Sequence, residues 1–220
     1  MEKRGDRRQS LVEAMGQVKI YVEGGGDQKK LKTACRKAFS KFFEKAGFKG
    51  HMPKFIACGS RQNAFDDFRT AVNSSPNGDI AFLLVDAESS VNIQYKDIPW
   101  SHLKQRDDWD KPDRASDHQA HLMVEVMEAW FIADKETLID FFGQNFNRNA
   151  LPKQSDIEAI SKNDIFNGLK SATSATQKGI YSKGAHSFTI LENIDPQKIF
   201  KASPWAERLR KKLAEELLHY

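Results

Sequence analysis

Apolar and polar positions alternate in two different ways along the first part of the chain. The segments 17–22, 54–59 and 80–86 predict strands, and the last is a continuous apolar run, as expected for a central strand covered on both faces. The segments 27–47 and 62–73 carry apolar residues at helical spacing. This strand–helix–strand–helix–strand order is typical of a parallel α/β sheet, in which ligands lie beyond the carboxyl ends of the strands.

The pattern changes after the third predicted strand. Residues 87–119 are polar and without clear periodicity, which predicts a long loop that is functional or partly disordered and orders on a ligand or partner. The segment 120–124 predicts a fourth strand, followed by one helix or by two helices broken near Asp134. We expect three parts: a charged N-terminal segment 1–16, an α/β core at 17–134 and a helical C-terminal extension at 135–220.

Composition narrows the class of protein. Hydrophobic residues make up 40% and charged residues 29% of the 220 residues, which suits a folded protein with an apolar core. The sequence contains no apolar run long enough for a membrane helix and no apolar stretch behind its charged start that would suggest a secretory signal. Cys35 and Cys58 lie in apolar segments and are expected to be reduced core thiols. We therefore expect a cytoplasmic protein.

Charge is unevenly distributed. The net charge is +4, but the first 50 residues carry 13 Lys/Arg and only 6 Asp/Glu, while the rest of the chain is acidic. The basic part suits a polyanion such as nucleic acid, although two solvated faces of opposite sign would give the same counts. The basic residues nearest the predicted strand ends are the candidate nucleic-acid contacts: Lys29, Lys30, Lys32 and Arg61.

The first candidate site follows the first predicted strand, where Glu23 precedes three glycines at 24–26. Glycines between a strand and a helix can cradle phosphate on backbone N–H groups. The segment matches neither the Walker loop nor the dinucleotide fingerprint. A bare carboxylate would repel phosphate, whereas a divalent cation between them makes Glu23 useful. A tight turn with an incidental exposed glutamate is an equally good interpretation of this motif alone.

The second candidate site follows the third predicted strand. Asp86 and Glu88 are two residues apart in a segment expected to be extended, so both carboxylates can face one ion. Hard cations such as Mg²⁺ prefer oxygen ligands and often use one or two carboxylates together with substrate phosphates. Taken alone, Asp86 is better explained as a strand-ending cap, but Glu23 at a neighbouring strand end favours a shared site.

Together these motifs resemble the Toprim domain of topoisomerases, bacterial primases and overcoming-lysogenization-defect (OLD) nucleases. The fuller sequence looks closest to an uncharacterised bacterial Toprim-like branch that is often associated with ATPase partners in anti-phage systems. The resemblance to Toprim covers about residues 17–130. The elements shared with the branch are Val22-Glu23-Gly24-Gly25, Cys58-Gly59-Ser60-Arg61, His121-Leu122-Met123, Met127-Glu128-Ala129-Trp130-Phe131 and Lys183-Gly184-Ala185-His186-Ser187.

The resemblance implies roles for individual residues. Glu23 matches the acidic residue that is a metal ligand or general acid/base, and Asp86 and Glu88 match the pair that binds Mg²⁺ or Mn²⁺. The second member of the pair is Glu88 where the family pattern has Asp, so its carboxylate lies one methylene further out. The resemblance also implies a nuclease activity and an ATPase partner in anti-phage defence.

Two residues outside the minimal Toprim pattern complete the candidate site. Glu128 lies among apolar residues, where a carboxylate needs a partner such as a metal ion. Glu125 precedes it at helical spacing, but both also fit an ordinary helix start. Lys183 can stabilise charge on a phosphoryl group, although a flexible surface turn explains its segment equally well.

The sequence therefore predicts a Toprim-like parallel α/β domain that hydrolyses phosphodiester bonds of DNA or RNA with Mg²⁺ or Mn²⁺. Glu23, Asp86 and Glu88 would bind the metal, with Glu128 as a further ligand and Lys183 as a catalytic cation. Nucleic acid and an ATPase partner are the expected partners, no membrane is expected, and an oligomer is compatible with the sequence. The alternative is a regulatory subunit that binds a nucleotide or partner at a degenerate site without cleavage.

Overall fold

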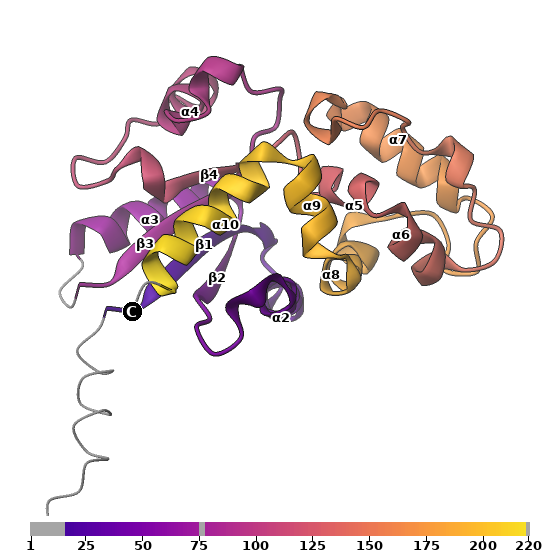
Figure 1. The fold of residues 1–220 in the computed structure, drawn as a ribbon, viewed down its shortest axis with the longest axis horizontal. Helices are drawn as coiled ribbons and strands as arrows, with labels where there is room; N and C mark the ends of the chain where they lie inside the picture. Colours follow the sequence, from indigo (N-terminus) through magenta and orange to yellow (C-terminus); the bar gives the residue numbers. More distant parts are fainter. Residues whose placement is uncertain (1–15, 75–77, 219–220) are drawn as a thin grey trace, which may run out of the picture.

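A four-stranded parallel sheet forms the centre of the computed structural model, which describes residues 16–74 and 78–218 (Figure 1). Its strands are β1 (Val18–Gly25), β2 (Lys54–Gly59), β3 (Ile80–Asp86) and β4 (Ala120–Met123), in the order β2-β1-β3-β4. The predicted parallel α/β fold is confirmed. Apart from Gly16, the charged N-terminal segment expected at 1–16 lies outside the described residues.

The strand register brings the predicted site residues to one edge of the sheet. β1 lies between β2 and β3, and Val22 of β1 pairs with Leu84 of β3. Glu23, near the end of β1, therefore lies beside the end of β3, where Asp86 pairs with Met123 of β4. Because all four strands run in the same direction, their carboxyl ends meet at this edge.

Helices cover both faces of the sheet (Figure 1). One face packs against α2 (Lys29–Phe43) and α10 (Pro204–Leu217), and the other packs against α3 (Arg61–Ser74). The central strands supply apolar side chains to both faces, because successive residues such as Leu83 and Leu84 point in opposite directions. This explains the continuous apolar run in β3.

The polar stretch 87–119 is not one long loop. It contains the helix α4 (Pro99–Asp107) and the short 3₁₀ helices η2 (Ile93–Tyr95) and η3 (Asp117–Gln119). Its Trp100 and Trp109 are buried in the core on the α3 side of the sheet. A helix of nine residues with few apolar positions gives little periodic signal, which is why the sequence did not reveal it. Its expected ordering on a ligand stays a prediction.

The C-terminal part is helical, as predicted. The helix α5 (Ala129–Ala133) ends at Asp134 and α6 (Lys135–Phe142) begins directly after it, which is the broken form of the predicted helix. Three further helices follow: α7 (Lys162–Thr173), α8 (Lys183–Asn193) and α9 (Pro196–Ala202). The remaining short elements are the π-helix η1 (Glu44–Phe48) and the 3₁₀ helices η4 (Arg148–Ala150) and η5 (Ile157–Ala159).

The last two helices return the chain to the sheet. α10 packs against β4 and α9, so the C-terminal extension and the core share one apolar interior. α10 begins at Pro204, and the Ser203 hydroxyl before it accepts a hydrogen bond from Ala206 N–H, as is typical of a helix N-cap. Among the described residues, the helices lack the length and apolar character needed to cross a membrane.

Candidate functional site

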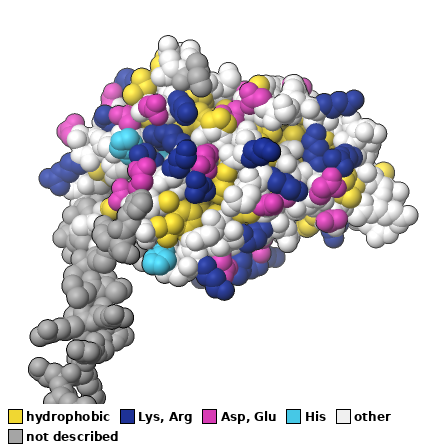
Figure 2. Space-filling model, in the orientation of Figure 1, with side chains coloured by type: hydrophobic (Ala, Val, Ile, Leu, Met, Phe, Trp, Pro, Cys, Tyr) yellow, Lys and Arg dark blue, Asp and Glu magenta, His cyan; other side chains and the backbone are white. Residues whose placement is uncertain are grey.

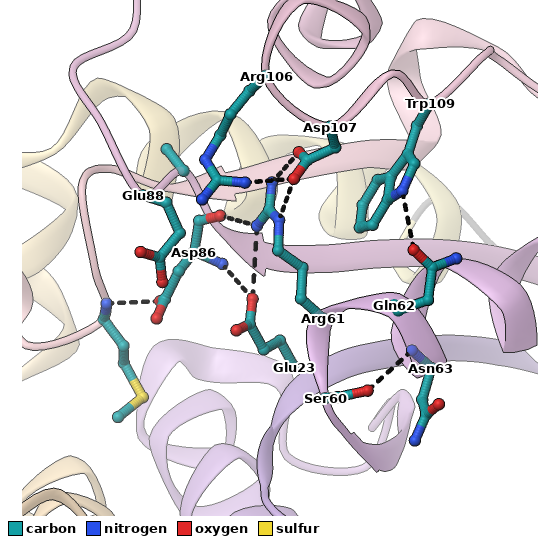
Figure 3. A network of polar contacts seen from close by, with 12 residues as sticks. Glu23, Ser60, Arg61, Gln62, Asn63, Asp86, Glu88, Arg106, Asp107 and Trp109 are labelled. Atoms are coloured by element: carbon teal, nitrogen blue, oxygen red, sulfur yellow. Dashed lines mark hydrogen bonds and ion pairs between the residues drawn. The ribbon is translucent and has the colours of Figure 1, made fainter.

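Three carboxylates converge at the carboxyl edge of the sheet (Figure 3). Glu23 lies near the end of β1, Asp86 ends β3 and Glu88 follows two residues later. One carboxylate oxygen of each lies within 4.8 Å of the others. The structure therefore brings together the residues that the sequence predicted as a metal site.

The glycine turn after Glu23 is required by close packing. Gly25 and Gly26 have φ of 85° and 49°, in the region that favours glycine. A Cβ on Gly25 would lie 2.7 Å from the Cα of Lys32, so a larger residue would push α2 away from the strand. The turn thus lets the first turn of α2 lie directly against the carboxyl end of β1.

Backbone hydrogen bonds fix the carboxylates of Asp86 and Glu23. Met127 N–H donates to Asp86 Oδ1 at 2.8 Å, and the Asp86 N–H donates to Glu23 Oε2 at 3.2 Å. The chain then turns through Glu88, which has a φ of 63° and whose N–H donates to the Glu125 carbonyl. A positive φ at a non-glycine residue is strained, and such strain is concentrated at functional sites.

Burial and a neighbouring negative charge shift the pKa of the Glu23 carboxyl. Burial and the negative charge of Asp86 raise the pKa of Glu23 from 4.5 to about 7, despite the opposing effect of Arg61. Its carboxyl therefore changes protonation state close to neutral pH. This is the pH range in which a general acid or base is most effective.

Arg61, at the start of α3, lies inside the site rather than on an open surface (Figure 3). Its Nε and Nη2 donate to the two oxygens of Asp107 at 3.0 and 2.6 Å, and its guanidinium lies 5.0 Å from the ring centroid of Trp109. Its Nη1 donates to Glu23 Oε2 at 3.4 Å and also contacts the Asp86 carbonyl. Arg61 is thus a fixed cation of the site, and its predicted contact with nucleic acid would occur there.

Lys183 is the first residue of α8, so its predicted surface turn is in fact a helix start. Its Nζ donates to Asp86 Oδ2 at 3.2 Å and lies 3.7 Å from Glu128 Oε2. Burial disfavours the charged ammonium, but the carboxylates of Asp86 and Glu128 outweigh it and raise the pKa of Lys183. Lys183 therefore carries a permanent positive charge beside the carboxylate cluster.

Glu128 lies behind Lys183 and outside the group of three converging carboxylates. It is completely buried, and Tyr181 OH donates to its Oε1 at 2.9 Å. Its Oε2 has no hydrogen-bond partner among the described residues. Burial raises the pKa of Glu128, and Lys183 opposes the shift. Glu125 does not share a helix face with Glu128, because Glu125 lies in the bend before α5.

The remaining basic residues are divided between open surface and internal contacts. Lys29 and Lys30 are exposed at the start of α2. The ammonium of Lys32 instead donates to the Cys58 carbonyl at 3.1 Å. Lys162, at the start of α7, forms an ion pair with Glu88.

A pocket of about 200 Å³ opens beside the carboxylates. Its polar lining includes Glu23, Asp86, Lys183 and the glycines at 24–26. Its apolar lining consists of four side chains: Leu31, Met123, Met127 and Phe188. These come from α2, the end of β4 with the bend after it, and α8, so the C-terminal extension completes the pocket.

Sequence reasoning missed the residues that support the site from a distance: Asp107, Lys162, Tyr181 and Phe188. Asp107 and Lys162 each occur among several charged residues, and the sequence does not say which one reaches the site. The many charged residues in 87–119 were the one sequence signal that this stretch contributes to the site. The contacts of Asp107, Lys162, Tyr181 and Phe188 follow from the packing of α4, α7 and α8 around the sheet edge.

Comparison with known proteins gives one family match. Searches of curated proteins and of solved structures found no match. Residues 22–214 match the family described as a domain of unknown function (DUF4276), and this range includes every residue of the site described above. The chain, with its carboxylate site at the edge of a parallel sheet, therefore belongs to the DUF4276 family.

Proposed function

We propose that the protein is a metal-dependent nuclease that hydrolyses phosphodiester bonds of DNA or RNA. The observation that carries the proposal is the convergence of Glu23, Asp86 and Glu88 within 4.8 Å at the carboxyl edge of the sheet. Ligands of parallel α/β sheets bind at this edge. The resemblance of the surrounding motifs to Toprim nucleases supports the same activity.

The residues present fit a divalent cation. All three side chains offer carboxylate oxygens, which are the ligands that Mg²⁺ and Mn²⁺ prefer. Burial and, after it, the negative charge of Asp86 raise the pKa of Glu23, so an ionised Glu23 is unfavourable in the metal-free chain. A cation held by Glu23, Asp86 and Glu88 would offset that repulsion, and we propose Mg²⁺ or Mn²⁺ as the ion.

The side chains around the ion would perform distinct tasks. When bound, the ion would supply Lewis acidity and lower the pKa of a bound water. The pKa of about 7 belongs to Glu23 in the metal-free chain; a bound cation would favour the ionised carboxylate and lower that pKa, so Glu23 would act there as a ligand. Lys183 and Arg61 hold fixed positive charge beside it, which stabilises negative charge developing on a phosphoryl group.

Nucleic acid would approach over the start of α2. Lys29 and Lys30 are exposed directly after the glycine turn and can contact phosphates on either side of the scissile one. On the face where α10 lies, basic and acidic side chains are interspersed (Figure 2). This arrangement favours local phosphate contacts over a long basic track on that face.

The resemblance further supports an ATPase partner and a role in anti-phage defence. A partner of this kind would supply the energy-dependent or targeting step, and this chain would supply the cleavage. Co-purification of the chain with the products of its neighbouring genes tests this extension. A stable complex with an ATPase is the expected result, and its absence from infected and uninfected cells would contradict it.

A non-catalytic regulatory subunit is the second candidate function, and one observation favours it. Each of the three carboxylates already has a cation of the chain beside it, since Arg61 contacts Glu23, Lys183 contacts Asp86 and Lys162 contacts Glu88. These contacts partly balance the charge of the site without a metal. In this case the pocket would bind a nucleotide or partner without cleaving it.

Cleavage assays with the full chain separate the two functions. Plasmid DNA, single-stranded DNA and tRNA are incubated with Mg²⁺, Mn²⁺ or EDTA. We expect cleavage with a divalent ion, none with EDTA, and a loss of at least about 100-fold in Glu23→Gln and Asp86→Asn. Asp110→Asn is the matched control, because the Asp110 side chain is 84% exposed and belongs to the α4 side of the molecule.

Two outcomes would contradict the nuclease function or its assignment to these carboxylates. If all three substrates stay intact with either ion, while calorimetry shows nucleotide binding that Asp86→Asn removes, the regulatory function is correct. Cleavage that persists undiminished in both variants would show that these carboxylates are not the catalytic site.

A further inference from the structure

The pocket beside the carboxylates has two chemically different walls. One wall carries Glu23, Asp86 and Lys183, which suit an ion and a phosphate. The other wall carries four apolar side chains, including Leu31 and Phe188. A bare phosphate or metal ion would use only the first wall, so the apolar wall calls for a ligand with an apolar part attached to its phosphate.

Two glycines keep the apolar part of the pocket open. A Cβ on Gly24 would lie 3.2 Å from Cys35 Sγ and 3.6 Å from Cζ of the Phe188 ring, and a Cβ on Gly184 would lie 4.0 Å from Leu31 Cδ1. Side chains at either position would therefore extend into the space between α2 and α8. Because Gly24 follows Glu23 and Gly184 follows Lys183, this space directly adjoins the charged wall.

The volume of the pocket limits the size of the ligand that it can bind. Pockets for drug-sized ligands hold about 300–1,000 Å³, and this pocket holds about 200 Å³. That is room for one flat ring system and not for a base pair. Phe188 is half-buried and lines the pocket, so part of its side chain is accessible there. Aromatic and apolar side chains bind any base through its face, independently of sequence.

We propose that this pocket receives a single unpaired nucleobase of the nucleic acid whose adjoining phosphate lies at Glu23, Asp86 and Glu88. The inference rests on the proposed nuclease function and names its substrate class. The base lies between Leu31 and Phe188, and Lys183 contacts the phosphate that joins it to the next nucleotide. A duplex must first release a base into the pocket, whereas a single strand or frayed end offers one directly.

Binding measurements can separate the contribution of the base to the affinity from that of the phosphates. A fluorescein-labelled short oligothymidylate is compared with an abasic oligomer of equal length by fluorescence anisotropy, with Ca²⁺ as an oxygen-binding cation. Both probes carry the same number of phosphates. We expect the wild-type chain to bind the oligothymidylate about tenfold more tightly, as stacking on one base predicts.

The decisive variant is Gly184→Leu. Gly184 lies in α8 with ordinary helical φ, so the backbone tolerates a side chain that fills the pocket from the direction of Leu31. We expect this variant to bind both probes equally. Ala185→Leu is the matched control, because Ala185 is the next residue of the same helix, is exposed and does not line the pocket. It should keep the tenfold ratio.

Phe188→Leu provides a second variant that keeps an apolar side chain but removes the ring, and it should reduce the ratio without unfolding the chain. Equal binding of both probes by the wild type, or an unchanged ratio in Gly184→Leu, would overturn the inference. Cleavage of blunt duplex as fast as of single strand would also overturn it while leaving the nuclease intact. Base-dependent binding without any cleavage would support the pocket and reject the nuclease.

Discussion

Asp134 and Asp86 are both almost fully buried carboxylates, at 1% and 2% exposure, but only Asp86 lies beside other buried acids of the site. Donors surround Asp134: Lys198 Nζ reaches Oδ1 at 2.6 Å, and Asp195 N–H and Thr137 Oγ1 reach Oδ2 at 2.9 and 2.7 Å. Burial by itself would raise the pKa of Asp134, but the hydrogen bonds from Lys198 and Asp195 outweigh it and lower the pKa. Asp134 thus anchors α9 to the break between α5 and α6.

Asp86 also accepts hydrogen bonds, from Met127 N–H and Lys183 Nζ, but unlike Asp134 it lies between other acids. Glu23 is on one side and Glu128 is beyond Lys183 on the other, and burial raises the pKa of both neighbours. Glu128 even keeps an oxygen without a hydrogen bond among the described residues. The difference teaches that burial of a carboxylate does not reveal its purpose. Donors alone indicate a structural anchor, whereas neighbouring acids in addition to donors indicate a site prepared for a cation or a proton.

The largest expected difference is in the pH dependence of stability. Glu23 has a pKa of about 7 in the folded chain and 4.5 as its ordinary value, so between these pH values the folded state binds more protons than the unfolded state. The free energy of unfolding should therefore fall as pH rises through this window, by about 3 kcal/mol in total. Urea unfolding in EDTA at several pH values measures this fall.

Two variants show which residue causes this pH dependence of the free energy of unfolding. Glu23→Gln should make the slope shallower, because the amide does not titrate, and other buried carboxyls with a raised pKa, such as Glu128, account for the rest. Asp134→Asn should leave it unchanged, since the lowered pKa of Asp134 affects stability only at more acidic pH, where protonation removes its contribution. An equally steep fall in Glu23→Gln would show that another group is responsible.

Metal binding should produce the next largest difference. A cation that binds only the folded state raises the free energy of unfolding by about 2.7 kcal/mol at 100 times its dissociation constant. We expect wild type and Asp134→Asn to gain equally from Mn²⁺, and Asp86→Asn to gain little. Thermal melting across a Mn²⁺ titration is the measurement. An undiminished gain in Asp86→Asn would place the cation elsewhere.

Stability of the metal-free chain should separate the two aspartates directly. Asp134→Asn should lose about 1–2 kcal/mol, because an amide cannot replace every acceptor interaction with Lys198, Asp195 and Thr137. Asp86→Asn should be neutral or slightly stabilising, since its oxygen still accepts from Met127 N–H and its charge no longer repels Glu23. A larger loss in Asp86→Asn than in Asp134→Asn would reverse the comparison.

The smallest effect concerns the strained turn at Glu88. Its φ of 63° suits glycine, so Glu88→Gly should stabilise the metal-free chain by less than about 1 kcal/mol after loss of the Lys162 ion pair. The same variant should bind Mn²⁺ more weakly. Calorimetric Mn²⁺ titration together with urea unfolding tests both parts. Lower stability with unchanged metal affinity would make Glu88 a structural residue.

The local pattern of apolar and polar residues was sufficient to predict the strands of the sheet and the acidic residues near their carboxyl ends. The apolar runs located β2 and β3 at their observed bounds, and parallel topology requires that their carboxyl ends share one edge. That is why Glu23, Asp86 and Glu88 could be predicted as one cluster from the sequence alone. The helix α4 was not predicted, because it is short and has few apolar positions.

The sequence by itself thus determined the parallel α/β core and the three converging carboxylates, since both follow from period, strand direction and residue type along contiguous segments. Only the tertiary structure decided which distant charges reach them. Asp107 fixes Arg61, Lys162 pairs with Glu88, and Phe188 completes the pocket through contacts between residues far apart in the chain. No local periodicity specifies such pairs, because each depends on how separate helices pack around the sheet edge.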